Sequence, residues 1–180
     1  MIEQIIEQTL KERRYYLDLR GFGIETIPKE IAQMHFLQNI ALSDNRIQDL
    51  SPLTPLSHLR KVALTNNRIS DIAIFKEFST KYLFLAKNQI SDLSPLTVHP
   101  TLKKLVIADN PVADLSPLAA MPKLTYLDIS HLPIKSIEPL FEIPTLRYLK
   151  AHGLPHLQKD LKKLKRALPN LYILDIKGTA

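Results

Sequence analysis

The side chains of this sequence that are most capable of chemistry are histidines and carboxylates in its C-terminal half. His131 and His152 are preceded by Asp109 and Asp128. Two imidazoles and two carboxylates on adjacent strands could hold a divalent metal. The chain has no HExxH motif and no glycine-rich phosphate loop, and it contains 4 glycines and no cysteine. We therefore predict no metal site, no cofactor, no catalytic residues and no enzymatic activity.

A second set of polar residues recurs at nearly constant spacing. The set comprises Asn45, Asn67, Asn88 and Asn110, which are 22, 21 and 22 residues apart. Each asparagine lies in the same phrase, which reads LxxIxLxxNxI where it starts at Leu37. An amide side chain both donates and accepts hydrogen bonds, so it can satisfy backbone groups where the chain turns out of a strand. We predict a structural ladder of turn asparagines rather than a ligand site.

The repeated phrase begins at Tyr15 and recurs until Leu171, and it predicts eight short parallel strands. Inward apolar positions alternate with outward positions at period two, which is the pattern of a strand. At Leu132 and Leu154 the asparagine is replaced, and we expect altered turns there. Between the phrases, segments such as DLSPL at residues 49–53 place a serine before a proline. The serine can cap free amides and the proline presets φ, so we predict short turns or 3₁₀ segments on the far side.

Both ends of the array should be covered, because an open solenoid exposes its apolar core. Residues 1–14 place isoleucines and a leucine on one helical face and glutamates on the other, as a capping helix would. Residues 156–180 contain a leucine-and-lysine helix that ends near Pro169, followed by a strand with the sequence LYILDI. Residues 15–155 carry the repeats, and we predict one domain over residues 1–180.

These phrases resemble the leucine-rich-repeat family, in particular its short 22-residue subclass, which includes a protein phosphatase-1 regulatory subunit and internalins. The closing ALPNLYILDI resembles the C-terminal cap of eukaryotic-type members. The resemblance implies an α/β solenoid shaped as a horseshoe, with parallel strands on its concave face, short turns on its convex face and helical caps. It also implies that the concave face recognises partners, although this fold hosts many functions.

The outward strand positions predict an aromatic surface on that concave face. The third position of successive phrases reads Tyr16, Asn39, Lys61, Tyr82, Lys104, Tyr126, Tyr148 and Ile173, and the next outward position reads Asp18, Ala41, Ala63, Phe84, Val106, Asp128, Lys150 and Asp175. An exposed Phe beside an exposed Val is a patch that a monomer has little cause to keep, and tyrosines make good interface anchors. The alternative is that tyrosine simply suits strands. We predict a protein-binding centre at Tyr82, Phe84, Lys104, Val106, Tyr126 and Tyr148.

A basic margin flanks this predicted centre and consists of Arg60, Lys61, Lys81, Lys103, Lys104 and Arg147. The formal net charge is +6, so we predict a protein partner with an acidic surface. The alternative is that these long side chains form a solvated edge. We interpret the lysine-rich C-terminal helix in the same way, rather than as a nucleic-acid stripe, because it lacks interleaved aromatics.

The most direct functional prediction is a non-enzymatic adaptor or regulator. Two alternatives stay open: a ribonucleoprotein assembly component, suggested by the basic charge and the cap, and an internalin-like effector or adhesin. The N-terminus lacks the basic start and apolar run of a secretory signal. No segment approaches the about 20 apolar residues that span a bilayer. We expect a cytoplasmic location and no membrane partner, and we predict neither a monomer nor a dimer in preference.

Overall fold

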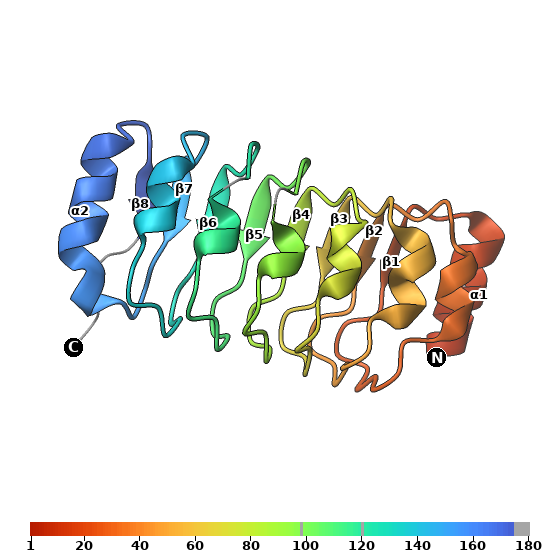
Figure 1. The fold of residues 1–180 in the computed structure, drawn as a ribbon. Helices are drawn as coiled ribbons and strands as arrows, with labels where there is room; N and C mark the ends of the chain where they lie inside the picture. Colours follow the sequence, from red (N-terminus) through yellow and green to blue (C-terminus); the bar gives the residue numbers. More distant parts are fainter. Residues whose placement is uncertain (98, 120, 175–180) are drawn as a thin grey trace.

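A computed structural model describes residues 1–97, 99–119 and 121–174, and it contains one sheet of eight parallel strands (Figure 1). The strands pair in chain order and are β1 (Tyr16–Asp18), β2 (Asn39–Ala41), β3 (Lys61–Ala63), β4 (Tyr82–Phe84), β5 (Lys104–Val106), β6 (Tyr126–Asp128), β7 (Tyr148–Lys150) and β8 (Tyr172–Leu174). The predicted α/β solenoid of parallel strands is therefore confirmed.

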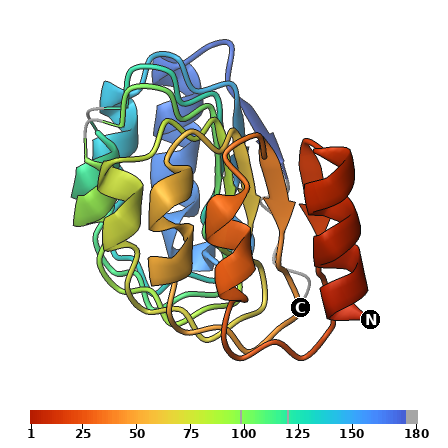
Figure 2. The same cartoon turned by 90° about the vertical axis from the view of Figure 1, so that its right-hand side faces the viewer.

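Short 3₁₀ turns lie on the opposite side of the core from the strands, as the end-on view shows (Figure 2). They are η1 (Lys29–Gln33), η2 (Ser51–Leu56), η3 (Ala73–Lys76), η4 (Ser94–Leu96), η5 (Ser116–Leu118), η6 (Glu138–Glu142) and η7 (Pro155–Leu157). We call the outer side of the strands the sheet face and the outer side of these turns the turn face. The two faces point in opposite directions, so each can present its own surface.

The caps of the 3₁₀ turns differ from the prediction in one respect. The serine is expected to cap free amides, but the preceding aspartate does so. Asp49 accepts hydrogen bonds from the backbone N–H of Ser51 at 2.8 Å and from its hydroxyl at 2.7 Å. The same arrangement holds at Asp92 and Asp114. The reason is reach, because a side chain two residues before the amide closes an Asx turn around it.

One continuous apolar core fills the space between the two faces. The middle residue of each strand from β1 to β7 points inward and is at most 1% exposed; these residues are Leu17, Ile40, Val62, Leu83, Leu105, Leu127 and Leu149. Burying one such side chain contributes about 1.5–3 kcal/mol. Since the middle residue points inward, the first and third residues of β1 to β7 point out onto the sheet face.

The asparagine ladder is confirmed as a structural feature. The Asn45 side-chain amide donates to the carbonyl of Leu42 in its own repeat at 2.9 Å and to that of Leu19 in the preceding repeat at 2.8 Å. Its Oδ1 accepts the backbone N–H of Ile24 at 2.9 Å. Equivalent bonds are made by Asn67, Asn88 and Asn110. Each asparagine therefore links two consecutive repeats through buried hydrogen bonds.

The ladder ends where leucine replaces asparagine, and the turn there changes as predicted. The N–H of Leu132 bonds to the carbonyl of Ile129 in its own repeat at 3.3 Å. The N–H groups of Asn45 and Asn67 instead reach carbonyls of the next repeat at 3.2 Å, and every ladder asparagine adds side-chain bonds that leucine cannot make. The residue before each keeps a left-handed backbone, with φ 59° at both Asp44 and His131. At Leu132 the turn thus lacks the side-chain amide bonds of the ladder, while the left-handed backbone of the preceding residue is kept.

Helices cover both ends of the array, as predicted (Figure 1). Helix α1 (Ile2–Glu12) lies beside β1 and buries Ile6, and it ends at Arg13, which has φ 50°. Helix α2 (Gln158–Ala167) buries Leu161 and Leu164. Within the described ranges, neither helix is long and apolar enough to cross a bilayer.

The register predicted for the last strand is wrong by one residue. Tyr172, and not Ile173, pairs with Tyr148, while Ile173 pairs with Leu149 and packs against the core. In earlier repeats one residue separates the buried leucine from the outward column, as Arg147 separates Leu146 from Tyr148, but Leu171 is followed directly by Tyr172. The predicted member Asp175 lies outside the described residues.

Candidate functional site

Outward side chains of neighbouring strands form columns across the sheet face. The first residues of β3 to β8 pair in one unbroken register and are Lys61, Tyr82, Lys104, Tyr126, Tyr148 and Tyr172. Beside them, the third residues of β4 and β5 are Phe84 and Val106, which pair with each other. Adjacent strands lie about 4.8 Å apart, so long side chains in these columns must touch.

Lysines lie over the rings of this surface. Lys104 Nζ is 3.8 Å from the ring centre of Tyr126 and 5.4 Å from that of Phe84. Lys61 Nζ is 5.5 Å from the same Phe84 ring. Ammonium groups at these distances are attracted by the negative face of the ring, by about 0.5–1 kcal/mol at exposed sites. Phe84 therefore holds two lysines in defined positions on the sheet face.

Three tyrosines extend this arrangement toward the C-terminal end. The ring centres of Tyr126 and Tyr148 are 6.3 Å apart, and those of Tyr148 and Tyr172 are 5.7 Å apart with planes only 20° from parallel. Lys165 of α2 lies 5.6 Å from the Tyr172 ring centre, and its ammonium donates to the carbonyls of Pro169 and Leu171. We call the continuous series the aromatic–lysine ladder; it consists of Lys61, Phe84, Lys104, Tyr126, Tyr148, Tyr172 and Lys165.

The ladder is electropositive at its centre. The pKa of Lys104 is lowered, first because burial penalises its charged form and then because Lys150 and Lys61 are near; Asp128 opposes this shift. Asp128 is partly engaged already, since it accepts hydrogen bonds from the backbone N–H and the hydroxyl of Ser130 at 3.1 and 2.7 Å. The ion pairs among the described residues involve none of these three lysines. Their positive charge is available to an outside group.

The structure places the predicted site residues in two groups. Phe84, Lys104, Val106 and Tyr126 are half-buried at the centre, whereas Tyr82 and Tyr148 are 39% and 46% exposed. Lys61 and Lys104 lie among the rings instead of beside them. Arg60 and Lys81 each precede a strand and stay at the edge, where Arg60 reaches Gln38 Oε1 at 3.5 Å. Arg60 and Lys81 thus lie at the edge of the predicted centre, and Lys61 lies among its rings.

Two members of the ladder are not found by sequence reasoning. Tyr172 is the second residue of the phrase that starts at Leu171, whereas the outward column uses the third residue. The last phrase is one residue shorter than the others before its strand, and the sequence pattern does not reveal this. Lys165 belongs to a helix, and its place over Tyr172 follows from how α2 packs. The frequent tyrosines of the outward columns could have indicated that Tyr172 belongs to the ladder. No feature of the sequence indicates that Lys165 does.

The histidines near the end of the sheet do not assemble a metal-binding set. Across the part of the chain that the structure describes, no three His, Asp or Glu side chains are grouped so that they could hold a metal ion. The backbone N–H of His131 donates to the carbonyl of His152 at 2.8 Å, as part of the inter-repeat pairing. The imidazole of His131 covers Gly153, where it has a packing role.

Comparisons with known proteins agree with this architecture. A family model described as leucine-rich repeat matches residues 1–115, and one for two copies of the repeat matches residues 100–142. Internalin InlF from Listeria monocytogenes is 24% identical with a TM-score of 0.80, covering 96% of this chain and 53% of its own. Internalin C2 from the same organism is 26% identical with a TM-score of 0.76, covering 91% of this chain and 74% of its own.

This chain thus spans about half the length of internalin InlF, whose 53% is covered. No curated protein matches the sequence. The first family model covers well over half of the 180 residues, and the strands, turns and asparagine ladder provide its structural basis. The chain belongs to the leucine-rich-repeat family.

Proposed function

We propose that this chain is a non-enzymatic adaptor or regulator that binds a protein partner on its sheet face. The contact surface consists of Tyr82, Phe84, Lys104, Val106, Tyr126 and Tyr148, with Arg60, Lys61 and Lys81 around it and Tyr172 at its end. The observation that supports this most is the aromatic–lysine ladder, a row of half-exposed rings and ammonium groups fixed on one sheet. The absence of cysteine suits a reducing compartment, so we place this function in the cytoplasm.

Rigidity makes the ladder suitable for binding. All its members except Lys165, which lies on α2, are attached to paired strands above an apolar core, and each ring or ammonium group lies within 6.3 Å of the next ring centre. Side chains that are already ordered lose little conformational entropy on association, and rings have few torsions to restrain. A large part of the binding free energy can therefore come from a few anchors such as Phe84 and Tyr126.

The chemistry of the ladder favours an acidic partner surface. The ring faces are turned toward lysines or other rings, which leaves ring edges and phenol hydroxyls toward solvent. Ring edges carry partial positive charge, and Lys61, Lys104 and Lys150 add full charges. Carboxylates on a partner would complement all of these groups. Charge complementarity of this kind acts mainly on association rate and specificity.

The test is capture of the partner by cross-linking in extracts of the source organism, followed by affinity measurements on substituted chains. Phe84→Ala and Tyr126→Ala should each weaken binding by about tenfold or more. Tyr15→Ala is the matched control, because Tyr15 is 64% exposed and lies beyond the other end of the patch. Circular dichroism checks the fold of each variant. Unchanged affinity in both folded patch variants would mean that the partner binds elsewhere.

The similarity to two internalins favours one second candidate, an internalin-like effector or adhesin. Binding of the labelled chain to the surface of cultured cells, lost in Phe84→Ala, would support it over an adaptor inside the cell. The ladder gives less support to a ribonucleoprotein role. Single-stranded RNA is held by stacking bases on free ring faces, and the rings of Tyr126, Tyr148 and Tyr172 already contact one another or a lysine.

A further inference from the structure

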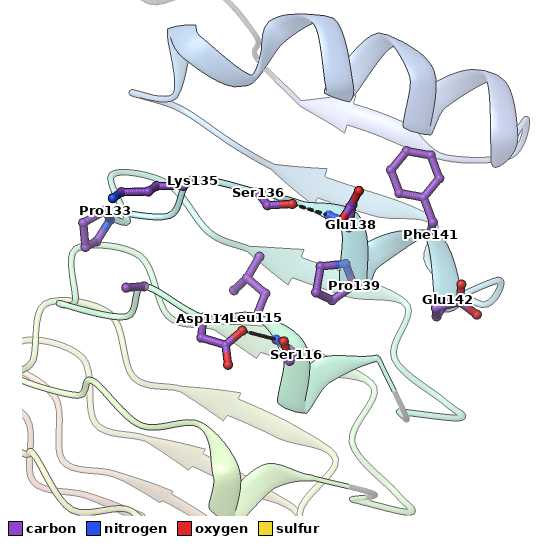
Figure 3. Close-up of a pocket in the computed structure, with 11 residues that line it drawn as sticks. Asp114, Leu115, Ser116, Pro133, Lys135, Ser136, Glu138, Pro139, Phe141 and Glu142 are labelled. Atoms are coloured by element: carbon purple, nitrogen blue, oxygen red, sulfur yellow. Dashed lines mark hydrogen bonds between the residues drawn. The ribbon is translucent and has the colours of Figure 1, made fainter.

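The turn face carries a groove of about 910 Å³ between the loops that follow β5 and β6 (Figure 3). Residues 113–116 form one wall, and residues between 133 and 142 of the next repeat form the other. The groove is on the opposite side of the core from the aromatic–lysine ladder, because its walls belong to the segments around η5 and η6. The proposed function on the sheet face makes no use of it.

The groove exists because two neighbouring repeats differ in side-chain size. Leu105 pairs with Leu127, and the same offset of 22 residues relates Ala113 to Lys135 and Ala119 to Phe141. At both positions a large side chain follows an alanine. The larger side chains therefore project farther from the core than the alanines of the preceding repeat, and the groove lies beside them.

The floor of the groove is apolar. Leu115 is almost fully buried beneath it, and Pro139 faces Leu115 across the gap (Figure 3). Phe141 is partly exposed and extends toward α2, where it also lines a smaller pocket with Asp160 and Lys163. This surface suits the aliphatic part of a long side chain.

The rim is acidic in a chain whose net charge is +6. Asp114, Glu138 and Glu142 line the groove, and Lys135 is the basic residue among its lining. The hydroxyl and backbone N–H of Ser116 both donate to Asp114 Oδ1 at 2.6 and 2.8 Å, and these bonds hold the pKa of that carboxyl below its usual range. The ion pairs found among the described residues include none of these three carboxylates.

We propose that this groove binds an extended, basic segment of a protein partner. Aliphatic stems of arginine or lysine lie on Leu115, Pro139 and Phe141, and their charged ends reach the carboxylates of the rim. The apolar floor and the acidic rim select such side chains together, and an acidic segment is repelled. Because the sheet face selects the opposite charge, the molecule can hold two different partners on its two faces at once.

The experiment is an NMR titration of the ¹⁵N-labelled chain with two nine-residue peptides, one of alternating arginine and alanine and one of alternating glutamate and alanine. We expect the arginine peptide to shift amide signals of residues 113–116, 135–138 and 140–142 and the glutamate peptide to leave them unchanged. The double variant Glu138→Lys/Glu142→Lys should bind the arginine peptide about tenfold more weakly or worse. Glu30→Lys/Glu77→Lys is the control with equal charge change, since both residues are exposed on other turns.

Shifts spread evenly over all acidic turns, or no shifts, would overturn the proposal. So would equal weakening in the two double variants, because the peptide would then sense only net charge. Phe84→Ala separates this groove from the sheet face: it should leave arginine-peptide binding intact even where it abolishes capture of an acidic partner. Loss of peptide binding in Phe84→Ala would assign the peptide to the sheet face instead.

Discussion

The imidazole of His131 occupies the space beside Gly153 in the next repeat, where a Cβ atom would lie 2.3 Å from Nδ1. Gly153 also has φ +70°, a backbone region that other residues enter at a cost of about 1–2 kcal/mol. Gly153→Ala should therefore lower the free energy of unfolding by about 2–4 kcal/mol, which combines backbone strain with overpacking. Urea denaturation measures this loss.

Gly23→Ala is the control for that prediction. Gly23 has φ +69°, but nothing lies within 4 Å of the place that the added methyl group would take, so only the backbone cost of about 1–2 kcal/mol applies. Adding His131→Ala to Gly153→Ala should recover part of the loss. Equal losses for the two glycine variants would show that the contact with His131 has no energetic weight.

The second prediction concerns the asparagine ladder. Asn88→Ala leaves the buried N–H of Ile69 without its partner, while the carbonyls of Leu64 and Leu85 lose one bond each and keep those from Asn67 and Asn110. An unsatisfied buried donor costs about 1–3 kcal/mol, so we expect a loss of about 1–3 kcal/mol in unfolding free energy. Asn66→Gly removes only an exposed hydrogen bond to Asp44 and should change stability by less than about 0.5 kcal/mol. Comparable losses at the two positions would contradict a special role for the ladder.

The third prediction concerns a histidine in an apolar column. The position two or three residues before each strand phrase from β2 to β7 is buried. It is occupied by Met34, Leu56, Phe78, His99, Met121 and Ile143. Within the described residues, neither ring nitrogen of His99 has a hydrogen-bond partner. His99→Met should raise the unfolding free energy at pH 7.5 by about 1–2 kcal/mol, because it removes unsatisfied polar atoms. A destabilised His99→Met chain would show that the imidazole is satisfied after all.

The same histidine makes stability depend on pH. Burial lowers the pKa of His99 below its usual 6.5. Below pH 6.5 the unfolded chain binds a proton that the folded chain does not, so stability is full above this pH and falls as pH drops toward the folded pKa. The lowered pKa of Asp18, about 2, lies outside this window. Urea midpoints between pH 7.5 and 5 should fall more steeply for the natural chain than for His99→Met, and parallel curves would contradict this.

The fourth prediction tests the electrostatics of the ladder. The pKa of the Lys104 ammonium should lie below the lysine value of 10.5, because of its burial and then because of Lys150. Lys150→Gln should move this pKa upward without restoring the full value, since the burial remains. NMR titration of the lysine side-chain signals measures both. Lys135→Gln is the control, because Lys135 lies on the turn face and should leave Lys104 unaffected.

The sequence was sufficient to predict the repeating architecture, and the reasons are visible at particular residues. Leu83 and its equivalents recur at a nearly constant spacing, so only one pairing of neighbouring strands places all of them in the core. Asn45 and its equivalents recur because each has buried hydrogen-bond partners in two repeats. The last strand could not be aligned, because one residue is missing between Leu171 and the outward column. The lysine positions over Phe84 could not be predicted either, since they depend on side-chain torsions and on neighbouring strands.

The end of the asparagine ladder has a mechanical consequence. Up to Asn110, consecutive coils are fastened together from inside, by amides buried next to the core. Beyond it, Leu132 and Leu154 offer no such amide, and the rings of Tyr126, Tyr148 and Tyr172 contact one another across the last three coils from outside. Strand pairing joins the coils of both halves, and the asparagine amides add to it in one half and the ring contacts in the other. We therefore expect a partner bound over these rings to stiffen the C-terminal half in particular.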